Sequence, residues 1–420
     1  MFKKHAKERL QKAALFHIML KQPLKNERSF MENFTHFIPT EYHFGKGAID
    51  CLGECLSRFG QNVLLTYGGG SIKRSGLYDK IIDICKSASL NVTELPGVEP
   101  NPQIKTVRKG IALCKSESID VILSVGGGST IDCSKAIAAG CFYNGDPWDM
   151  VLAGGNQGGK SLPLVDVMTL AATGSEFDPD AVISNEETNQ KLDGKYCCPN
   201  VSICDPTFTF SVPANQTAAG SADIMSHICE QYFSRVFDSD LSEAIGEGIL
   251  KSVIKNLPKA LANPSDYSAR ANLMWDSSVA CSGIPAYGKI PTNWPCHAME
   301  HELSGFYNIT HGVGLAILTP RWMRFILKKD PTVTPRFVQF ARNVWGLDSD
   351  DDAALAREGI EALEDFFASV NLPSTLTELG IGDEHFGDMA DDIEQVSGGL
   401  EGDYVPLTKE DIVNIYKDCL

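Results

Sequence analysis

Two short apolar segments in the first third of the chain each end in three consecutive glycines. Residues 62–67 precede Gly-Gly-Gly-Ser at 68–71, and residues 121–125 precede Gly-Gly-Gly-Ser at 126–129. A strand that ends at glycines and continues into a helix leaves free backbone N–H groups at the helix N-terminus, where a phosphate can bind. Neither loop is a complete dinucleotide fingerprint or a P-loop. Two such loops in one α/β unit still favour a bound dinucleotide over simple chain reversal.

The segment 37–206 alternates between expected strands and expected helices. This alternation is typical of a parallel sheet with helices on both faces. The expected strands are residues 62–67, 91–94, 121–125 and 165–170, and the expected helices are residues 77–88, 104–116 and 130–139. After Pro213 few β-branched runs occur, and amphipathic helices are expected at residues 216–234, 242–257, 267–281, 314–326 and 351–370.

These patterns predict two domains, as a chain of 420 residues also does by its length. Residues 31–208 are expected to form an α/β dinucleotide-binding domain with a Rossmann-like parallel sheet. Residues 209–420 are expected to form an all-α helical, metal-binding domain, with the active site in the cleft between the two. Residues 1–30 form a separate basic extension, in which one serine and two glutamates argue against a targeting peptide.

Composition excludes several classes of function. The net charge of −17 argues against binding of nucleic acid, whose phosphates need a basic surface. No apolar run reaches the roughly 20 residues that span a bilayer, so we expect no membrane association. Thirteen cysteines without a Cys-x-x-Cys pair or a secretory leader indicate reduced thiols and a cytoplasmic location.

Five chemistry-bearing side chains fall in two stretches of the second half. Asp223 and His227 are spaced i, i+4 and would share one face of a helix, so they could chelate one ion. His297, His301 and His311 follow in the second stretch, and His297 with the expected loop residue His311 could complete the set. Each histidine alone is more simply structural. Together, three imidazoles and a carboxylate suit Zn²⁺ or Fe²⁺ better than Ca²⁺ or Mg²⁺.

The chain resembles the iron-containing (group III) alcohol dehydrogenase family, in particular its NADPH-dependent butanol dehydrogenase and aldehyde reductase branch. The resemblance rests on both glycine loops, on Thr-Gly-Ser-Glu at 173–176 and on the Asp/His set, and it extends from about residue 37 to the C-terminus. It implies that chains of this kind begin near Met31 and form homodimers. It also implies a role for each candidate site residue: metal binding by Asp223, His227, His297 and His311, and a non-ligating catalytic role for His301.

The first glycine loop favours NADP(H) as the coenzyme. An NAD site normally has a carboxylate that accepts hydrogen bonds from the adenosine ribose. From Gly68 onward, no acidic residue occurs in this segment until Asp79. Ser71 could donate to a 2′-phosphate, and Lys73 or Arg74 could neutralise it. The expected coenzyme-binding residues are therefore Gly69, Gly70, Ser71 and Lys73 for the adenosine end, and Gly127, Gly128 and Ser129 for the pyrophosphate.

Further residues are expected near the nicotinamide. Asp132 would orient its ribose or amide, whereas Lys135 is expected to face solvent. Through the resemblance, Thr169, Thr173 and Lys191 match residues that line the nicotinamide pocket. The chain departs from the family pattern at Asp178, where asparagine is usual; a carboxylate there would change the charge beside the nicotinamide or substrate, or turn to solvent.

The function predicted is hydride transfer between NADPH and short-chain aliphatic aldehydes of the butanal type, with Fe²⁺ or Zn²⁺ polarising the carbonyl group. Ile284, Tyr287, Trp294 and Phe306 could line an apolar pocket near the histidines. Two alternatives stay open. One is a metal- and dinucleotide-dependent enzyme like dehydroquinate synthase or glycerol dehydrogenase. The other is a non-catalytic sensor of nucleotide or metal, which would show no coenzyme turnover.

Overall fold

The computed structural model describes residues 31–420 except 157, 398, 401 and 402, so the basic extension at 1–30 lies outside the described residues. The N-terminal part is built on a six-stranded sheet in which every neighbouring pair is parallel. Its order is β1-β8-β5-β4-β2-β3. The strands are β1 (Glu41–Phe44), β2 (Asn62–Tyr67), β3 (Asn91–Pro96), β4 (Val121–Gly126), β5 (Leu164–Met168) and β8 (Val201–Cys204).

Helices cover both faces of this sheet, because the central strands are apolar on both sides. On β2, Leu64 packs in one core cluster, while Val63 and Leu65 pack in another on the opposite face. The first cluster lies under α5 (Ile104–Ser116), α6 (Gly128–Gly140) and α7 (Pro147–Leu152). The second lies under α2 (Leu52–Ser57), α3 (Ser71–Arg74) and α4 (Leu77–Ser87).

The strand order reverses between β2 and β4, which pair in register from Val63 with Val121 to Tyr67 with Val125. Ligands of open α/β sheets bind beyond the carboxyl ends of the strands at such a reversal. Both glycine loops begin there. The predicted sheet is thus confirmed. An antiparallel hairpin of β6 (Asp180–Asn185) and β7 (Gln190–Lys195) follows β5 and was not predicted.

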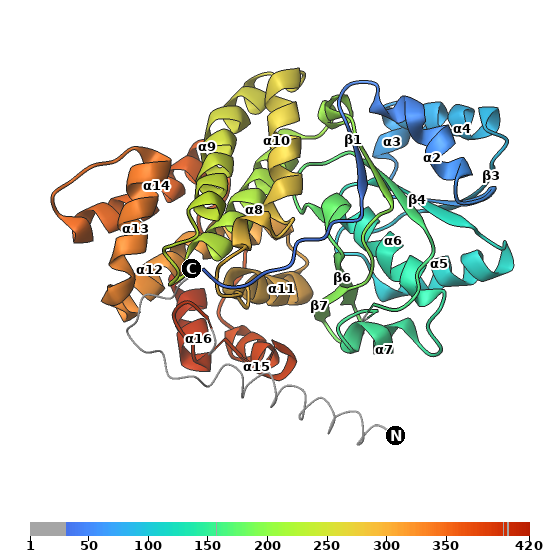
Figure 1. Ribbon diagram of the computed structural model, residues 1–420. Coiled ribbons are helices and arrows are strands. Elements are labelled where there is room, and N and C mark those ends of the chain that lie inside the picture. The colour runs from blue at the N-terminus through green and yellow to red at the C-terminus, as the bar shows by residue number, and fades with distance from the viewer. Residues whose placement is uncertain (1–30, 157, 398, 401–402) are drawn as a thin grey trace.

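The C-terminal part consists of helices packed around one large core (Figure 1). Five of them match the predicted positions to within a few residues, whereas the other four, α11, α13, α15 and α16, were not predicted. None of the described helices is both long and apolar enough to cross a membrane. The helices are α8 (Ala214–Tyr232), α9 (Asp240–Ala262), α10 (Tyr267–Ala280), α11 (Pro295–Tyr307), α12 (His311–Lys329), α13 (Thr334–Phe340), α14 (Asp352–Ser369), α15 (Phe386–Ser397) and α16 (Lys409–Asp418).

Candidate metal and coenzyme site

The four predicted metal ligands converge from three helices. Asp223 and His227 lie one turn apart on α8, His297 lies on α11, and His311 is the first residue of α12 rather than a loop residue as predicted. The Oδ1 atom of Asp223 lies 3.5 Å from Nε2 of His227 and 3.6 Å from Nε2 of both His297 and His311. One carboxylate oxygen therefore faces three imidazole nitrogens.

The donor atoms fit a divalent ion. Four ligands each about 2.1 Å from a tetrahedral ion lie about 3.4 Å from one another, close to the separations from Asp223 Oδ1. Among the described residues, Asp223 Oδ1 and His297 Nε2 have no hydrogen-bond partner although both are buried. A buried polar atom without a partner is costly, so a metal ion bound by both atoms would remove this cost.

Close backbone contacts bring these helices together. A Cβ atom on Gly312, beside His311, would lie 1.9 Å from the carbonyl oxygen of Ala219 on α8, so only glycine allows this approach. Helix α11 starts after Trp294, which adopts the left-handed conformation (φ 55°), and ends at Asn308 (φ 50°). The sharp turns at both ends set the position of His297 between the other two helices.

Two buried glutamates orient the imidazole rings. The Nδ1 atom of His297 is hydrogen-bonded to Glu230, which also accepts a bond of 2.6 Å from the Cys296 N–H, and Nδ1 of His311 is hydrogen-bonded to Glu300. A carboxylate at Nδ1 keeps the proton there and leaves the Nε2 lone pair for a metal. The sequence analysis missed both residues, although Glu230 lies three residues after His227 on the same helix.

The charges in this cluster alter its pKa values. Burial raises the pKa of Asp223, but the three histidines lower it by more, so the carboxyl group is ionised. Burial lowers the pKa of His227 to about 3. For His297 burial acts in the same direction, yet Glu230 and Asp223 raise its pKa to about 10. The site thus combines a fixed anion with one neutral and one readily protonated imidazole.

His301 adjoins the ligands without joining them. Its ring centre lies 6.4 Å from that of His297 and 5.6 Å from that of His311. Burial and the neighbouring charges of Lys191, His311 and His297 lower the pKa of His301 well below its ordinary value. The ring is therefore neutral, with one N–H and one free lone pair.

The glycine loops differ in what surrounds them. At the first loop, Gly70 has φ +95°, which favours glycine, and a Cβ on Gly69 would meet no atom within 4 Å. Ser71 and Lys73 are exposed on α3. At the second loop, a Cβ on Gly128 would lie 2.3 Å from the hydroxyl oxygen of Thr173. The first loop is thus open to a ligand, and the second is packed against the segment after β5.

The remaining predicted pocket residues lie near this second loop or the metal ligands. The Thr169 N–H donates to the Gly126 carbonyl over 2.9 Å. Ser129 directly follows Gly127 and Gly128 at the start of α6 and is half-buried. Lys191, on β7, is buried and donates over 3.1 Å to Glu300. The hairpin thereby connects the sheet domain to a carboxylate that orients a metal ligand.

Two charged side chains, Lys135 and Asp178, differ from what the sequence suggested. Lys135 does not face solvent: it is fully buried and lies 2.8 Å from Asp178, because the β6–β7 hairpin covers α6. Asp178 consequently neither faces solvent nor adds an unpaired charge. Both carboxylate oxygens of Asp132 accept bonds within the chain, from the Ser175 hydroxyl (2.6 Å) and the Val182 N–H (3.0 Å).

An acid that the sequence analysis did not consider lies beside the first loop. Glu94, on β3, accepts hydrogen bonds from the hydroxyl groups of Tyr67 (2.5 Å) and Tyr78 (2.7 Å), and one of its oxygens lies 3.9 Å from Lys73 Nζ. It escaped notice because it follows the loop by more than twenty residues in sequence and reaches it only through the pairing of β2 with β3.

Of the four proposed pocket-lining residues, Trp294 lies beside the histidines. The distance between ring centres is 5.9 Å from Trp294 to His227 and 5.3 Å from Trp294 to His297. Tyr287 instead stacks on Phe34 at 4.6 Å. Phe306 packs against His385 at 5.3 Å.

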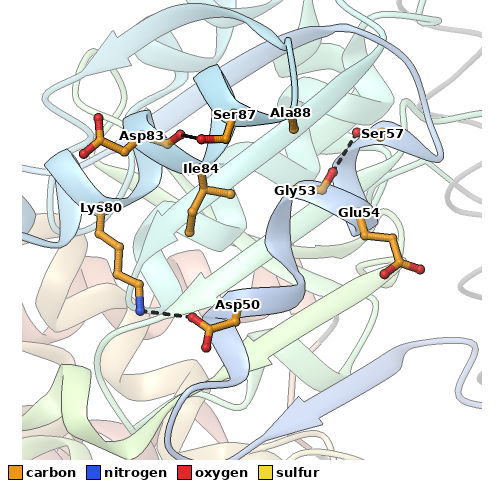
Figure 2. Close-up of a pocket in the computed structure, with 9 residues that line it drawn as sticks. All are labelled: Asp50, Gly53, Glu54, Ser57, Lys80, Asp83, Ile84, Ser87 and Ala88. Carbon is orange, nitrogen blue, oxygen red and sulfur yellow. Dashed lines mark hydrogen bonds and ion pairs between the residues drawn. The ribbon is translucent and has the colours of Figure 1, made fainter.

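Two other features do not belong to this site. A surface hollow of about 760 Å³ between α2 and α4 is lined by Asp50, Glu54, Lys80 and Asp83 among others, and Lys80 pairs with Asp50 at 3.3 Å (Figure 2). His43, Cys51 and Cys55 also bring three donor atoms together. Their atoms already have partners, because Arg58 donates to the Cys55 sulfur and Cys51 donates to a backbone carbonyl.

A doubly wound parallel sheet, glycine loops at its reversal point and a buried Asp/His₃ set on the adjoining helices define the class of two-domain metal-dependent dehydrogenases. Comparison with known proteins is more specific. Residues 39–206 match the iron-containing alcohol dehydrogenase family, and residues 217–420 match the C-terminal domain of the same family. The chain belongs to the iron-containing alcohol dehydrogenase family.

Similar proteins include NADH-dependent butanol dehydrogenase A of Clostridium acetobutylicum, 50% identical over 92% of this chain and 99% of that protein. The NADPH-dependent aldehyde reductase YqhD of Escherichia coli is 36% identical over 84% of this chain and 90% of that protein. The crystal structure of NADH-dependent butanol dehydrogenase A from Thermotoga maritima superimposes with a TM-score of 0.88 at 38% identity, covering 93% of this chain and 99% of that one.

Proposed function

We propose that this alcohol dehydrogenase interconverts short-chain aliphatic aldehydes and alcohols of the butanal and butanol type, using a nicotinamide dinucleotide and one divalent ion. The observation that carries the proposal is the convergence of three imidazole nitrogens on one unpaired, buried carboxylate oxygen. Relatives named butanol dehydrogenases support the substrate class.

Each residue has a task in this proposal. Asp223, His227, His297 and His311 hold the ion, and Glu230 and Glu300 fix the tautomers of the last two. When bound, Fe²⁺ or Zn²⁺ acts as a Lewis acid on the substrate oxygen. His301, neutral because of its lowered pKa, passes a proton to or from that oxygen through its ring nitrogens. Trp294 covers the histidines and helps to exclude water from the reacting atoms.

The coenzyme is assigned to the two glycine loops. Gly69, Gly70, Ser71 and Lys73 would hold the adenosine end. Residues after β4 and β5 would hold the pyrophosphate and nicotinamide, namely Gly127, Gly128, Ser129, Asp132, Thr169 and Thr173, together with Lys191 on β7.

NADP(H) stays a prediction, supported by Ser71 and Lys73. Two observations favour NAD(H) instead. Glu94 lies beside Lys73. Two similar proteins are named NADH-dependent butanol dehydrogenases, and two more carry the same name with the word "probable".

The same proposal extends to organisation. Residues 31–208 would form the coenzyme domain and residues 209–420 the metal domain. A homodimer is supported by the exposed side chains of Phe37, Phe44 and Trp275 near β1, which pairs on one side only. Thirteen free cysteines support a reducing, cytoplasmic location.

The test is coenzyme oxidation with butanal by protein stripped of metal and then reloaded separately with Fe²⁺ and Zn²⁺, with NADPH and NADH in parallel. Activity that returns only with metal is expected. The Asp223→Asn variant should bind metal poorly and stay inactive after reloading. A folded protein that binds metal yet turns over neither coenzyme with any short aldehyde would contradict the proposal and favour a sensor.

A further inference from the structure

Four side chains form a polar cluster at the edge of the first glycine loop. Glu94 is the centre, since it accepts bonds from Tyr67 and Tyr78 and pairs with Lys73. The ammonium group of Lys73 also lies 4.4 Å from the ring centre of Tyr78 and 5.1 Å from that of Tyr67. The two tyrosines thus orient the carboxylate from one side and hold the lysine over their rings.

This arrangement changes what Lys73 can do. A lysine beside the adenosine ribose would attract a 2′-phosphate, which carries a charge of about −1.5 to −2 at neutral pH. Here the lysine already has an anionic partner, and that partner would repel the same phosphate. A ribose with a free 2′-hydroxyl meets no such repulsion, and a carboxylate can accept its hydrogen bond.

We propose that Glu94 is the residue that determines coenzyme preference: by pairing with Lys73 and by its own charge it disfavours the 2′-phosphate of NADPH and so favours NADH. The inference rests on the proposed function in one respect, that the first glycine loop holds the adenosine end of the coenzyme. It goes beyond that function by assigning the discrimination to a side chain on a neighbouring strand.

The hydroxyl groups that bind Glu94 do not themselves require a carboxylate. Tyr78 and Glu94 are partly exposed, and the Glu94 side chain retains 37% of its accessible surface, so water can accept the hydroxyl bonds in place of a carboxylate oxygen. The negative charge is therefore not needed to satisfy the tyrosines. Lys73 is about half exposed and adds little to stability by this surface pair. The cluster lies within reach of a ligand on the loop.

The experiment is a binding measurement that needs no turnover. Isothermal titration calorimetry compares 2′,5′-ADP with 5′-AMP, which differ by the 2′-phosphate, on the metal-loaded wild type and on Glu94→Gln. The glutamine removes the charge and keeps one of the two oxygens that accept from Tyr67 and Tyr78; its amide N–H can donate to the hydroxyl oxygen of the other tyrosine. We expect the ratio of the two affinities to shift toward 2′,5′-ADP by at least about tenfold, and by less at high salt.

Two further variants sharpen the test. Glu99→Gln removes a carboxylate that lies near Lys105 and Thr106 instead, and it should change the ratio less than about twofold. Lys73→Met should weaken the binding of 2′,5′-ADP but not that of 5′-AMP. In the Lys73→Met background, Glu94→Gln should raise the affinity for 2′,5′-ADP by a smaller factor. A gain that persists undiminished there would overturn the role given to Lys73.

The outcomes separate this inference from the proposed function. If Glu94→Gln leaves the ratio unchanged while Lys73→Met lowers the affinity for 2′,5′-ADP, the role of Glu94 is wrong and the loop assignment stands. If neither nucleotide binds to wild type or variants, the loop assignment itself is wrong. In each case thermal unfolding of the variants verifies that the fold is intact.

Discussion

The buried pair of Lys135 and Asp178 gives a quantitative prediction about stability. Lys135 is fully buried on α6 and contacts Asp178 at 2.8 Å and the carbonyl oxygen of Asp180 at 2.7 Å. Burial lowers the pKa of Lys135, but Asp178 and Asp132 raise it by more, so the lysine stays charged. Asp178 also accepts the Asp180 N–H over 2.9 Å. The pair therefore joins the hairpin to the helix behind the second glycine loop.

We expect Asp178→Asn to destabilise the protein. Removing one partner of a buried ion pair costs about 3–5 kcal/mol. The asparagine keeps an oxygen for both hydrogen bonds, and Asp132 still compensates part of the charge, so about 2–3 kcal/mol is a better figure. For a domain of this size each kcal/mol lowers Tm by about 2–4 °C, which gives a decrease of about 4–12 °C.

The assay is thermal unfolding of the metal-loaded protein, followed by circular dichroism. Asp193→Asn, at an exposed position of the same hairpin, should leave Tm unchanged. The double variant Lys135→Met with Asp178→Asn should recover part of the loss, because the buried ammonium group is then gone, while the buried Asp132 loses its compensating charge. A single variant with unchanged Tm but altered kcat or coenzyme KM would refute this reasoning and show that the carboxylate acts on the reaction.

Three further predictions concern the site. Glu230→Gln and Glu300→Gln should each weaken metal binding about 10–100-fold, measured by competition with a chelating dye. The control variant Glu302→Gln should not weaken it, because Glu302 lies on the same helix as Glu300 but is bonded to no metal ligand. Gly128→Ala should reduce the coenzyme affinity, measured by fluorescence titration, and should also lower Tm, because the new Cβ would lie 2.3 Å from a threonine hydroxyl. The control variant Gly248→Ala should not lower Tm, because a Cβ there would meet no atom within 4 Å. Removing the metal with a chelator should abolish activity and lower Tm, and adding metal back should restore both, since an ion that binds only the folded state stabilises it by mass action.

Local sequence patterns predicted most elements of the fold. The helix expected at 104–116 is α5, and the strand expected at 62–67 is β2, with the same limits. The helix follows from apolar residues at helical spacing, and the strand follows from a short apolar run that ends at glycines. Strands β1 and β8, the hairpin β6–β7 and several helices, α11 among them, were not predicted. The hairpin has little apolar alternation, and α11 begins after a left-handed tryptophan without a side-chain cap, so tertiary contacts rather than local signals define them.

The metal ligands were easier to predict than the residues that support them. Few histidines occur in the chain, so their spacing beside Asp223 is informative. Glutamates are common, and nothing in the sequence separates Glu230 and Glu300 from glutamates on the surface. Their role follows from burial: both are almost inaccessible, and each is bonded to the far nitrogen of a ligand ring. Burial of a polar side chain depends on packing between helices, and a short stretch of sequence does not reveal that packing.

The coenzyme prediction shows the same dependence on neighbouring strands. It considered residues 68–74 and found a lysine with no acid nearby in sequence. Because β2 pairs in parallel with β3, with Leu65 opposite Glu94, the sheet brings a carboxylate to the same edge. In a parallel sheet the residues around one loop come from adjacent strands that are tens of residues apart. In the proposed site a coenzyme phosphate would therefore meet charges from both segments, and the positive charge of Lys73 on α3 is opposed by the negative charge of Glu94 on β3.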